Sequence, residues 1–264
     1  LLVMKVKDII KVIEEFAPLT IQEGWDNSGL CIGSPEDKVS SVLLGLDCTP
    51  ELVDEAIACG ADMIVTHHPL IFRASMSVTD ETTVGRSILY LASRGISAVN
   101  AHTNLDCCPG GVNDVLAETL GLSDVEVVTP LGTDGEGRPY GLLRSGTVEE
   151  MPLETFLEQV KLRLGTPVLR YVNCGKPVRK VAVGGGSCGD SYPEALAAGC
   201  DTLVTADVKY NHFWDSVELG LNLIDAGHFY TENPVCAILA QKLREAFPEI
   251  EVVISKHTDC MKFF

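Results

Sequence analysis

The amino-acid sequence predicts an α/β protein made of two similar, interlocking halves. Three observations support this fold class. Short β-branched runs alternate with helical segments after a turn-rich stretch at residues 24–29. The sequence also resembles itself at a constant offset of about 139 residues. Finally, histidines and acidic residues follow apolar runs at corresponding places in the two halves.

Local patterns place several elements along the chain. Residues 6–16 are predicted to form the first helix, because Ile9, Ile13 and Phe16 form an apolar stripe and Pro18 prevents continuation. Residues 153–164 form a second amphipathic pattern, which predicts a connecting helix. Between these helices, residues 134–139 indicate a turn or short linker, and residues 140–146 indicate a strand.

The internal repeat needs no gap over its core. It superposes Gly45 on Gly184, Gly60 on Gly199, Asp62 on Asp201, and Thr66 on Thr205. Each copy is predicted to form a strand, a turn, a helix that ends at a glycine, and a second strand. We therefore expect a first α/β half at residues 1–127 and a second at residues 128–264.

Composition limits the classes of partner. The net charge of −17, without a cluster of Lys and Arg, argues against a nucleic-acid surface. No apolar run approaches the roughly 20 residues that cross a bilayer, and residues 1–11 lack a signal-peptide pattern, so we expect a cytoplasmic protein without membrane partners.

The ten cysteines are scattered, with no C-x-x-C spacing, and are expected to be reduced. Cys107 and Cys108 are expected to pack as small hydrophobes, with thiolate ligation or redox chemistry as the alternative.

The most informative polar pair is His67-His68, which directly follows an apolar strand. Two adjacent imidazoles at a strand end can point to opposite sides of the backbone and serve neighbouring ions. The alternative is structural, with one histidine in a solvated loop and the other bonded to a backbone carbonyl in the core. The corresponding residues of the second copy, Ala206-Asp207, diverge at this position.

A pattern of histidine and acidic residues that recurs in both halves favours a metal site between them. Each half contains a His-x-x-x-acid pattern after an apolar run, at His102 to Asp106 and at His228 to Glu232. These patterns lie near strand-to-helix turns, where ligands gather in open α/β sheets. Imidazole with carboxylate suits Zn²⁺, Mn²⁺, Fe or Ni²⁺ better than Ca²⁺ or Mg²⁺. Two carboxylates can bridge a pair of ions about 3.5–4 Å apart and leave positions open for water.

Five motifs together resemble the Nif-three-like family, whose members are often labelled GTP cyclohydrolase I type 2 homologs. The motifs are GWDNSGL at residues 24–30, ADMIVTHHPL at residues 61–70, HTNLD at residues 102–106, TADVKY at residues 205–210, and GHFYTE at residues 227–232. They span most of the chain in the order expected for the family.

The resemblance implies a dinuclear metal centre with two divalent ions per chain. Its ligands correspond here to His67, His68, Asp106, His228 and Glu232. His102 also matches the pattern and is expected to support the ligands or to transfer protons. The resemblance further implies a ring-shaped homohexamer, a trimer of dimers. Some members carry an inserted middle domain, for which the short turn around Gly135 leaves no room.

The resulting hypothesis is metal-assisted hydrolysis of GTP or of another nucleotide or phosphorylated small molecule. A metal-containing scaffold that binds protein partners is the main alternative, because a closed structural site can use the same ligands. An NAD(P)-dependent oxidoreductase is a remote alternative. It rests on the G-x-G-x-x-G pattern at residues 184–189, which is more simply explained by relief of crowding between the halves. His212 and His257 have no assigned role.

Overall fold

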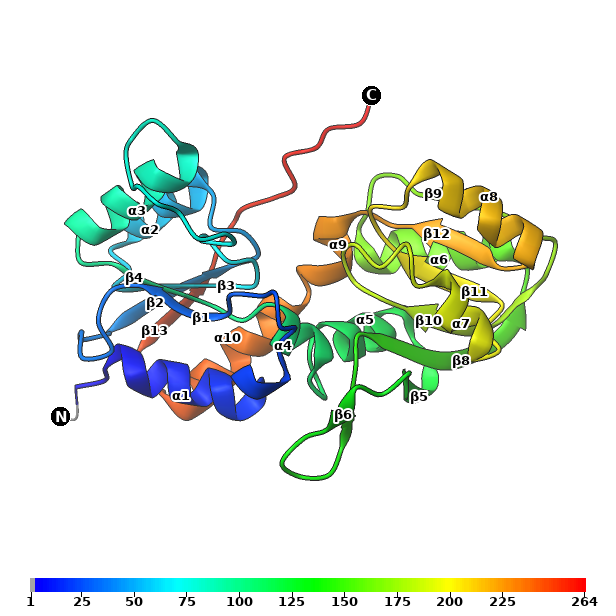
Figure 1. Ribbon diagram of the computed structural model, residues 1–264, viewed down its shortest axis with the longest axis horizontal. Helices are drawn as coiled ribbons and strands as arrows, with labels where there is room; N and C mark the ends of the chain where they lie inside the picture. Colours follow the sequence, from blue (N-terminus) through cyan, green and yellow to red (C-terminus); the bar gives the residue numbers. More distant parts are fainter. Residues whose placement is uncertain (1–2) are drawn as a thin grey trace. The chain divides into compact units, whose positions relative to one another are not determined.

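The computed structural model describes residues 3–264, which form two compact units of mixed α/β structure (Figure 1). The first unit contains the described residues up to Leu105 together with Val235–Thr258. The second contains Asp106–Pro234 and Asp259–Phe264. These limits differ from the repeat-based halves. A strand from the end of the chain pairs within the first sheet, and the helix and strand that precede residue 128 pack in the second unit.

The first unit is built on a five-stranded sheet. The strand order is β1-β4-β3-β2-β13, with β13, β2, β3 and β4 mutually parallel and β1 antiparallel to β4. The strands are β1 (Gly29–Ile32), β2 (Ser41–Gly45), β3 (Met63–Thr66), β4 (Ser97–Asn100) and β13 (Glu251–Ile254). The helices are α1 (Val6–Phe16), η1 (Leu19–Ile21), α2 (Pro50–Cys59), α3 (Thr83–Ser93) and α10 (Val235–Ala246). The short helix α4 (Thr103–Cys107) begins in this unit and ends in the next.

Helices cover both faces of this sheet. Figure 1 shows α1 and α10 on one face, and α2 and α3 on the other. Leu43 of β2 and Ile64 of β3 belong to the same buried cluster as Leu52 of α2 and Leu91 of α3. Every residue of β2, β3 and β4 is buried, which is typical of parallel strands covered on two sides.

The second unit is built on a six-stranded sheet of order β5-β8-β10-β11-β12-β9. Its strands are β5 (Ser123–Val128), β8 (Leu143–Met151), β9 (Arg170–Val172), β10 (Val178–Val183), β11 (Thr202–Thr205) and β12 (Asn222–Asp225). A small hairpin consists of β6 (Gly132–Thr133) and β7 (Pro139–Tyr140). The helices are α5 (Val112–Leu120), α6 (Leu153–Leu164), α7 (Tyr192–Ala197), α8 (Tyr210–Leu219) and α9 (His228–Glu232).

Alternate residues of the central strands of this sheet pack into two different cores. Val204 of β11 and Ile224 of β12 pack with Phe156 of α6. Their neighbours, Leu203 and Leu223, belong to a separate buried cluster that includes residues of α7. Because successive side chains of a strand point to opposite faces, the two clusters lie on the two sides of the sheet.

The internal repeat is also a structural repeat. In each unit three consecutive parallel strands are adjacent in the sheet, β2-β3-β4 in the first and β10-β11-β12 in the second. Asp62 accepts hydrogen bonds from the backbone N–H groups of Ser40 and Ser41. Asp201, at the corresponding position, accepts them from Arg179 and Lys180. The aspartates that the repeat aligns therefore make the same contact, at the start of β2 and of β10.

Two predicted helices have the predicted bounds, at Val6–Phe16 and Leu153–Leu164. The single strand predicted over residues 140–146 is wrong, because the chain is interrupted at Gly141 and forms β7 and β8 instead. The interruption has a packing reason. A Cβ atom at Gly141 would lie 2.9 Å from a methyl group of Val127, and the Gly141 carbonyl accepts a hydrogen bond from Arg144. None of the described helices combines the length and the apolar character needed to cross a bilayer.

Arg144 is the largest side chain that is fully buried in the described part of the chain. Its guanidinium donates two hydrogen bonds to the carboxylate of Asp114 and others to the carbonyls of Gly141, Cys107 and Cys108. A bidentate pair of this kind is strong, and removal of one partner leaves the others buried and unsatisfied. Arg144 therefore joins β8, α5 and the segment before α5.

We expect Arg144→Met to lower the free energy of unfolding by about 3–5 kcal/mol, because it leaves Asp114 and three carbonyl groups without their donor. Equilibrium urea denaturation followed by circular dichroism would measure the change. Arg138→Met is the matched control. The Arg138 guanidinium is about half exposed where it pairs with Asp134, and its loss should cost much less stability than the loss of Arg144. Equal losses in the two variants would contradict a special role for Arg144.

Candidate metal centre

His67 and His68 are positioned by the end of β3. The Thr66 hydroxyl donates to the backbone carbonyl of His68, and the His68 N–H donates to the Leu46 carbonyl, at 2.8 and 2.9 Å. These bonds continue the sheet beyond the last residue of the strand. The His67 ring is fully buried, the His68 ring is partly exposed, and their centroids are 4.8 Å apart.

His102 joins this pair from the neighbouring strand. It follows β4, and the Ala101 N–H donates to the carbonyl of Thr66, so the ends of β3 and β4 lie side by side. The His102 ring lies 5.2 Å from that of His67 and 5.5 Å from that of His68. One ring nitrogen from each of the three histidines lies within 4.8 Å of the other two. The first unit thus brings three imidazoles into a group that can hold a metal ion.

Each of these imidazoles is oriented by a hydrogen bond at Nδ1. The Nδ1 atoms of His67, His68 and His102 lie 2.8, 2.6 and 2.8 Å from oxygens of Ala101, Asp47 and Asp26. An N–H group at Nδ1 that donates to an oxygen fixes the tautomer in which Nε2 carries the lone pair. Histidines that bind metals show this arrangement, with the second ring nitrogen held by a carboxylate or carbonyl oxygen.

The partner of His102 is itself held firmly. The Asp26 side chain is fully buried and accepts hydrogen bonds from the hydroxyl and the backbone N–H of Thr103, at 2.6 and 3.0 Å. Burial opposes ionisation of this carboxyl, but the hydrogen bonds from His102 and Thr103 outweigh it and hold its pKa well below its usual range. Asp26 is therefore ionised at neutral pH and accepts the hydrogen bond from Nδ1 of His102.

The second unit contributes a histidine and two carboxylates. His228 and Glu232 lie one turn apart on α9, and the distance from His228 Nε2 to Glu232 Oε2 is 2.9 Å. His228 Nδ1 lies 2.7 Å from Asp207 Oδ2. Oxygens of Asp106 and Glu232 lie within 4.8 Å of one another. Within the second unit, Glu232 therefore lies close to both His228 and Asp106.

The charges around His228 favour a cation. Burial disfavours the protonated ring, but the hydrogen bonds with Asp207 and Glu232 outweigh it and raise the pKa of His228 to about 10. The contact with His228 also holds the pKa of Asp207 below its usual value. Asp207 has a positive φ of 50°, which is uncommon for a residue other than glycine. Carboxylates that stabilise a proton on this ring also stabilise a divalent ion beside it.

The glycine-rich loop after β10 packs against α9. The N–H groups of Gly185 and Gly186 donate to the side chains of Asn113 and Thr231, at 2.7 and 3.0 Å. A Cβ atom at Gly186 would lie 2.0 Å from Glu232 Oε1 and 3.0 Å from His228 Nε2. The loop therefore leaves room for Glu232 inside the second unit. Its amide groups are used within the unit, which argues against a dinucleotide site.

Three carboxylates were not singled out as part of the site by sequence reasoning. Asp26, Asp47 and Asp207 each hold the Nδ1 atom of one histidine. A signal was present for two of them, since Asp26 lies in the motif at residues 24–30 and Asp207 aligns with His68 in the repeat. Asp47 follows β2 and gave no signal of its own.

Other groups lie outside the site. His212 lies on α8, where its ring packs against that of Tyr192. Burial raises the pKa of the Cys108 thiol well above its usual range, so this thiol is protonated at neutral pH and is a poor metal ligand. The alternative of a thiolate ligand at Cys108 therefore finds no support.

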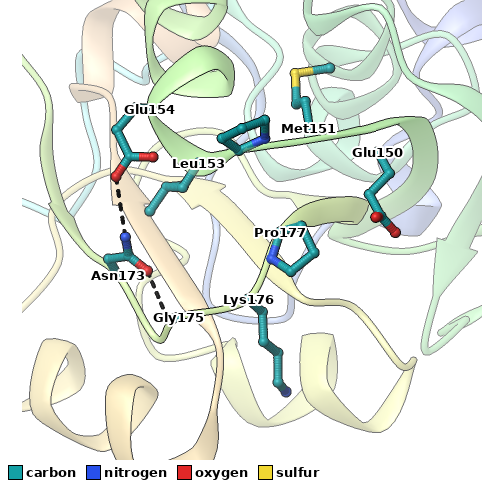
Figure 2. Close-up of a pocket in the computed structure, with 9 residues that line it drawn as sticks. Glu150, Met151, Leu153, Glu154, Asn173, Gly175, Lys176 and Pro177 are labelled. Atoms are coloured by element: carbon teal, nitrogen blue, oxygen red, sulfur yellow. Dashed lines mark hydrogen bonds between the residues drawn. The ribbon is translucent and has the colours of Figure 1, made fainter.

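A surface depression of about 430 Å³ lies at the end of the second sheet opposite to the end that carries His228 (Figure 2). Pro177 immediately precedes β10, so the depression is at the amino end of this strand, whereas His228 follows the carboxyl end of β12. Asn173 donates to Glu154 and accepts from the Gly175 N–H, and Lys176 donates to the Gly220 carbonyl. In Figure 2 the side chain of Lys176 extends away from the other labelled residues. The depression has no part in the candidate site.

The donor set fits a metal centre. Imidazole nitrogens and carboxylate oxygens are the ligands preferred by Zn²⁺, Mn²⁺, Fe and Ni²⁺. The carboxylates of Asp106 and Glu232 and the ring of His67 are buried, and buried groups of these types can hold metal ions. The orientation of every imidazole through Nδ1 completes the arrangement expected of ligands.

Comparisons with known proteins identify similar sequences. The model of the family described as Duf34/NIF3 (NGG1p interacting factor 3) matches residues 4–260. A Clostridium perfringens protein named GTP cyclohydrolase 1 type 2 homolog is 38% identical over 258 residues, which cover 96% of this chain and 97% of that protein. A Helicobacter pylori protein named GTP cyclohydrolase 1 type 2 is 32% identical, with 90% and 91% covered.

The fold is also found among solved structures. The crystal structure of a Bacillus cereus protein related to NIF3 superposes with a TM-score of 0.93. The two sequences are 27% identical, and the match covers 99% of each chain. The similarity therefore extends over both units of the structure.

Gly186→Ala tests whether the glycine loop makes room for a metal ligand. The added methyl group would displace the Glu232 carboxylate, and we expect metal affinity to fall at least about tenfold. Gly199→Ala is the matched control, because Gly199 also has a positive φ but a Cβ atom added there would meet no other atom within 4 Å. Both variants should lose about 1–2 kcal/mol of stability from backbone strain.

Titration with Zn²⁺ against a competing chelator would measure the affinities. An unchanged affinity in Gly186→Ala, or an equal loss in Gly199→Ala, would contradict the role assigned to Gly186.

Proposed function

The chain belongs to the Duf34/NIF3 family, and from this premise we propose that it is a metal-dependent hydrolase with two divalent ions per chain. The proposed ligands are His67, His68, Asp106, His228 and Glu232. The observation that carries the proposal is the hydrogen bond at Nδ1 of each histidine, which leaves Nε2 available as the metal ligand. The metal is one that accepts nitrogen and oxygen donors, namely Zn²⁺, Mn²⁺, Fe or Ni²⁺.

Bound ions of this kind lower the pKa of a water ligand toward about 7 and polarise a phosphoryl or carbonyl oxygen. The protein contributes the geometry and the charge. His67 is fixed by a backbone carbonyl, whereas His68 and His228 are fixed by the carboxylates of Asp47 and Asp207. Asp106 and Glu232 supply the negative charge that offsets that of the cations.

His102 is proposed to transfer a proton. Its ring lies beside those of His67 and His68, and its Nδ1 atom donates to Asp26. The ionised Asp26 accepts the Nδ1 proton and fixes the tautomer, so Nε2 can take up a proton from the reacting water and release it to the leaving group. The same geometry suits a metal ligand, and the two roles predict different effects of substitution.

The proposed substrate class is supported by the names of the relatives. Proteins named GTP cyclohydrolase 1 type 2 or its homolog cover nearly the whole chain, which supports GTP or another nucleotide or phosphorylated small molecule. The competing proposal is a metal-containing protein that binds protein partners. It is favoured by the family description, NGG1p interacting factor 3, and by the burial of His67, Asp106 and Glu232.

The homohexameric ring, built as a trimer of dimers, stays a prediction for this chain. Analytical ultracentrifugation would test it, since a hexamer has six times the chain mass of 28.4 kDa. A monomer or dimer across the working concentration range would contradict it.

Removal of a ligand should remove metal. We expect about two metal ions per chain in the purified protein after dialysis, and less than half of that in Asp106→Ala and Glu232→Ala. Elemental analysis by mass spectrometry would measure both. His212→Ala is the matched control, since His212 lies outside the proposed ligand set and should leave the metal content unchanged.

The same preparations would be assayed for release of phosphate or formate from GTP. Full metal content in the Asp106 and Glu232 variants would refute the ligand assignment. A full metal content without hydrolysis of any nucleotide or phosphate ester would favour the interaction protein.

His102→Gln separates proton transfer from metal binding. If His102 transfers the proton, kcat should fall about 10²- to 10⁴-fold, and the metal content should stay at the level of the unaltered protein. A drop in metal content in this variant would instead make His102 a ligand.

A further inference from the structure

Two aromatic side chains lie exposed beside His102. The indole of Trp25 is 61% exposed and the ring of Phe72 is 44% exposed. The centroids of these two rings are 5.9 Å apart, and they lie 6.2 and 6.0 Å from the centroid of His102. The three rings are packed edge to face, with interplanar angles of 72°, 76° and 82°. The cluster lies entirely within the first unit, next to the group that contains His67 and His68.

The backbone beneath these rings is fixed by hydrogen bonds. Trp25 immediately precedes Asp26, whose buried carboxylate is bound by His102 and Thr103. The next residue, Asn27, donates through its side chain to the carbonyl of Ile71 at 2.6 Å, directly before Phe72. Asn100, the last residue of β4, donates to the Asn27 carbonyl at 3.1 Å. The same turn therefore holds Trp25, the segment of Phe72, and the partner of His102.

A single exposed hydrophobic residue has no special meaning, since much of any protein surface is apolar. Here two large rings are exposed together, are held in place, and contact the proposed proton-transfer group. Rings fixed before a ligand arrives lose little conformational entropy on binding. Aromatic faces stack on the planar rings of nucleobases without requiring a particular base.

We propose that Trp25 and Phe72 form a platform that binds the planar heteroaromatic ring of the substrate, such as a nucleobase, while its polar end reaches His102 and the metal ions. The proposal rests on the proposed hydrolase and specifies its substrate class. It assigns the recognition of the ring to the turn at residues 24–28 and to the segment after Ile71. A phosphorylated compound without such a ring would then bind more weakly.

A second aromatic cluster provides the competing site. Trp214 on α8 is 59% exposed and lines a cavity of about 290 Å³, together with Arg170, Tyr171, Tyr210 and Phe213. No proposed metal ligand or proton-transfer group lines this cavity. Trp25, in contrast, contacts His102 directly, which is why the platform is assigned to Trp25.

The chain has only two tryptophans, so the fluorescence of each aromatic cluster can be measured separately. Trp214→Phe leaves Trp25 as the fluorophore, and Trp25→Phe leaves Trp214. We expect guanosine 5′-monophosphate to quench the fluorescence of the metal-loaded Trp214→Phe protein in a saturable way, and to leave that of the Trp25→Phe protein unchanged. Ribose 5-phosphate, which lacks the base, should not produce the quenching.

Binding constants measured by calorimetry complete the test. Trp25→Ala and Phe72→Ala should each weaken binding of guanosine 5′-monophosphate about tenfold and leave that of ribose 5-phosphate unchanged. Trp214→Ala, the matched control, should change neither. Both rings of the platform are exposed, so these variants should fold and keep the metal content of the unaltered protein.

Quenching of Trp214 instead of Trp25, or equal losses for the ligands with and without a base, would overturn the proposal. The proposal would also be overturned if Trp25→Ala and Phe72→Ala changed only the oligomeric mass. The two rings would then form a contact between copies of the chain. These outcomes can be distinguished from a result that refutes the proposed hydrolase. A protein that binds no metal but still shows base-dependent quenching of Trp25 would lose the hydrolase and keep the platform.

Discussion

A hydrogen bond at Nδ1 determines what each histidine of the candidate centre can do. An imidazole that can rotate, or that carries its proton on the wrong nitrogen, is a poor ligand, whatever its position in the fold. The structure supplies an oxygen for His67, His68, His102 and His228, in each case from the same unit. For His67, His68 and His228, parallel strands make this possible, because their carboxyl ends place the histidine of one segment beside the carbonyl or carboxylate of another. For His102 the oxygen comes from Asp26, just before the antiparallel strand β1.

The two copies of the repeat carry different side chains at the carboxyl ends of their strands. After β3 the first copy carries His67-His68, and after β11 the second carries Ala206-Asp207. Asp207 is not a candidate ligand like His68 but orients the ring of His228. Likewise Gly186, close to Glu232 in the second copy, aligns with Asp47, which holds His68 in the first. Similar backbones thus carry imidazoles in one copy and a carboxylate-rich group in the other.

Local sequence patterns were sufficient where the structure is set by nearby residues. The helix at Val6–Phe16 ends before Pro18 as its apolar stripe predicts. The repeat identified the parallel strands because their burial produces apolar runs. The pairing of β13 with β2 was not predictable, since it joins distant parts of the chain and depends on tertiary packing. Asp47 was missed for a related reason: a lone aspartate after a strand resembles a surface residue until its histidine partner is placed.

The backbone at Asp207 has a consequence for how this chain can change. A φ of 50° strains most side chains, but aspartate and asparagine tolerate it and glycine adopts it freely. Either replacement satisfies the backbone and removes the negative charge that faces His228. Selection for stability and selection for a correctly charged imidazole therefore oppose each other at one residue. Sequences chosen only for thermal resistance would drift toward glycine at this position and would retain the fold after losing an oriented ligand.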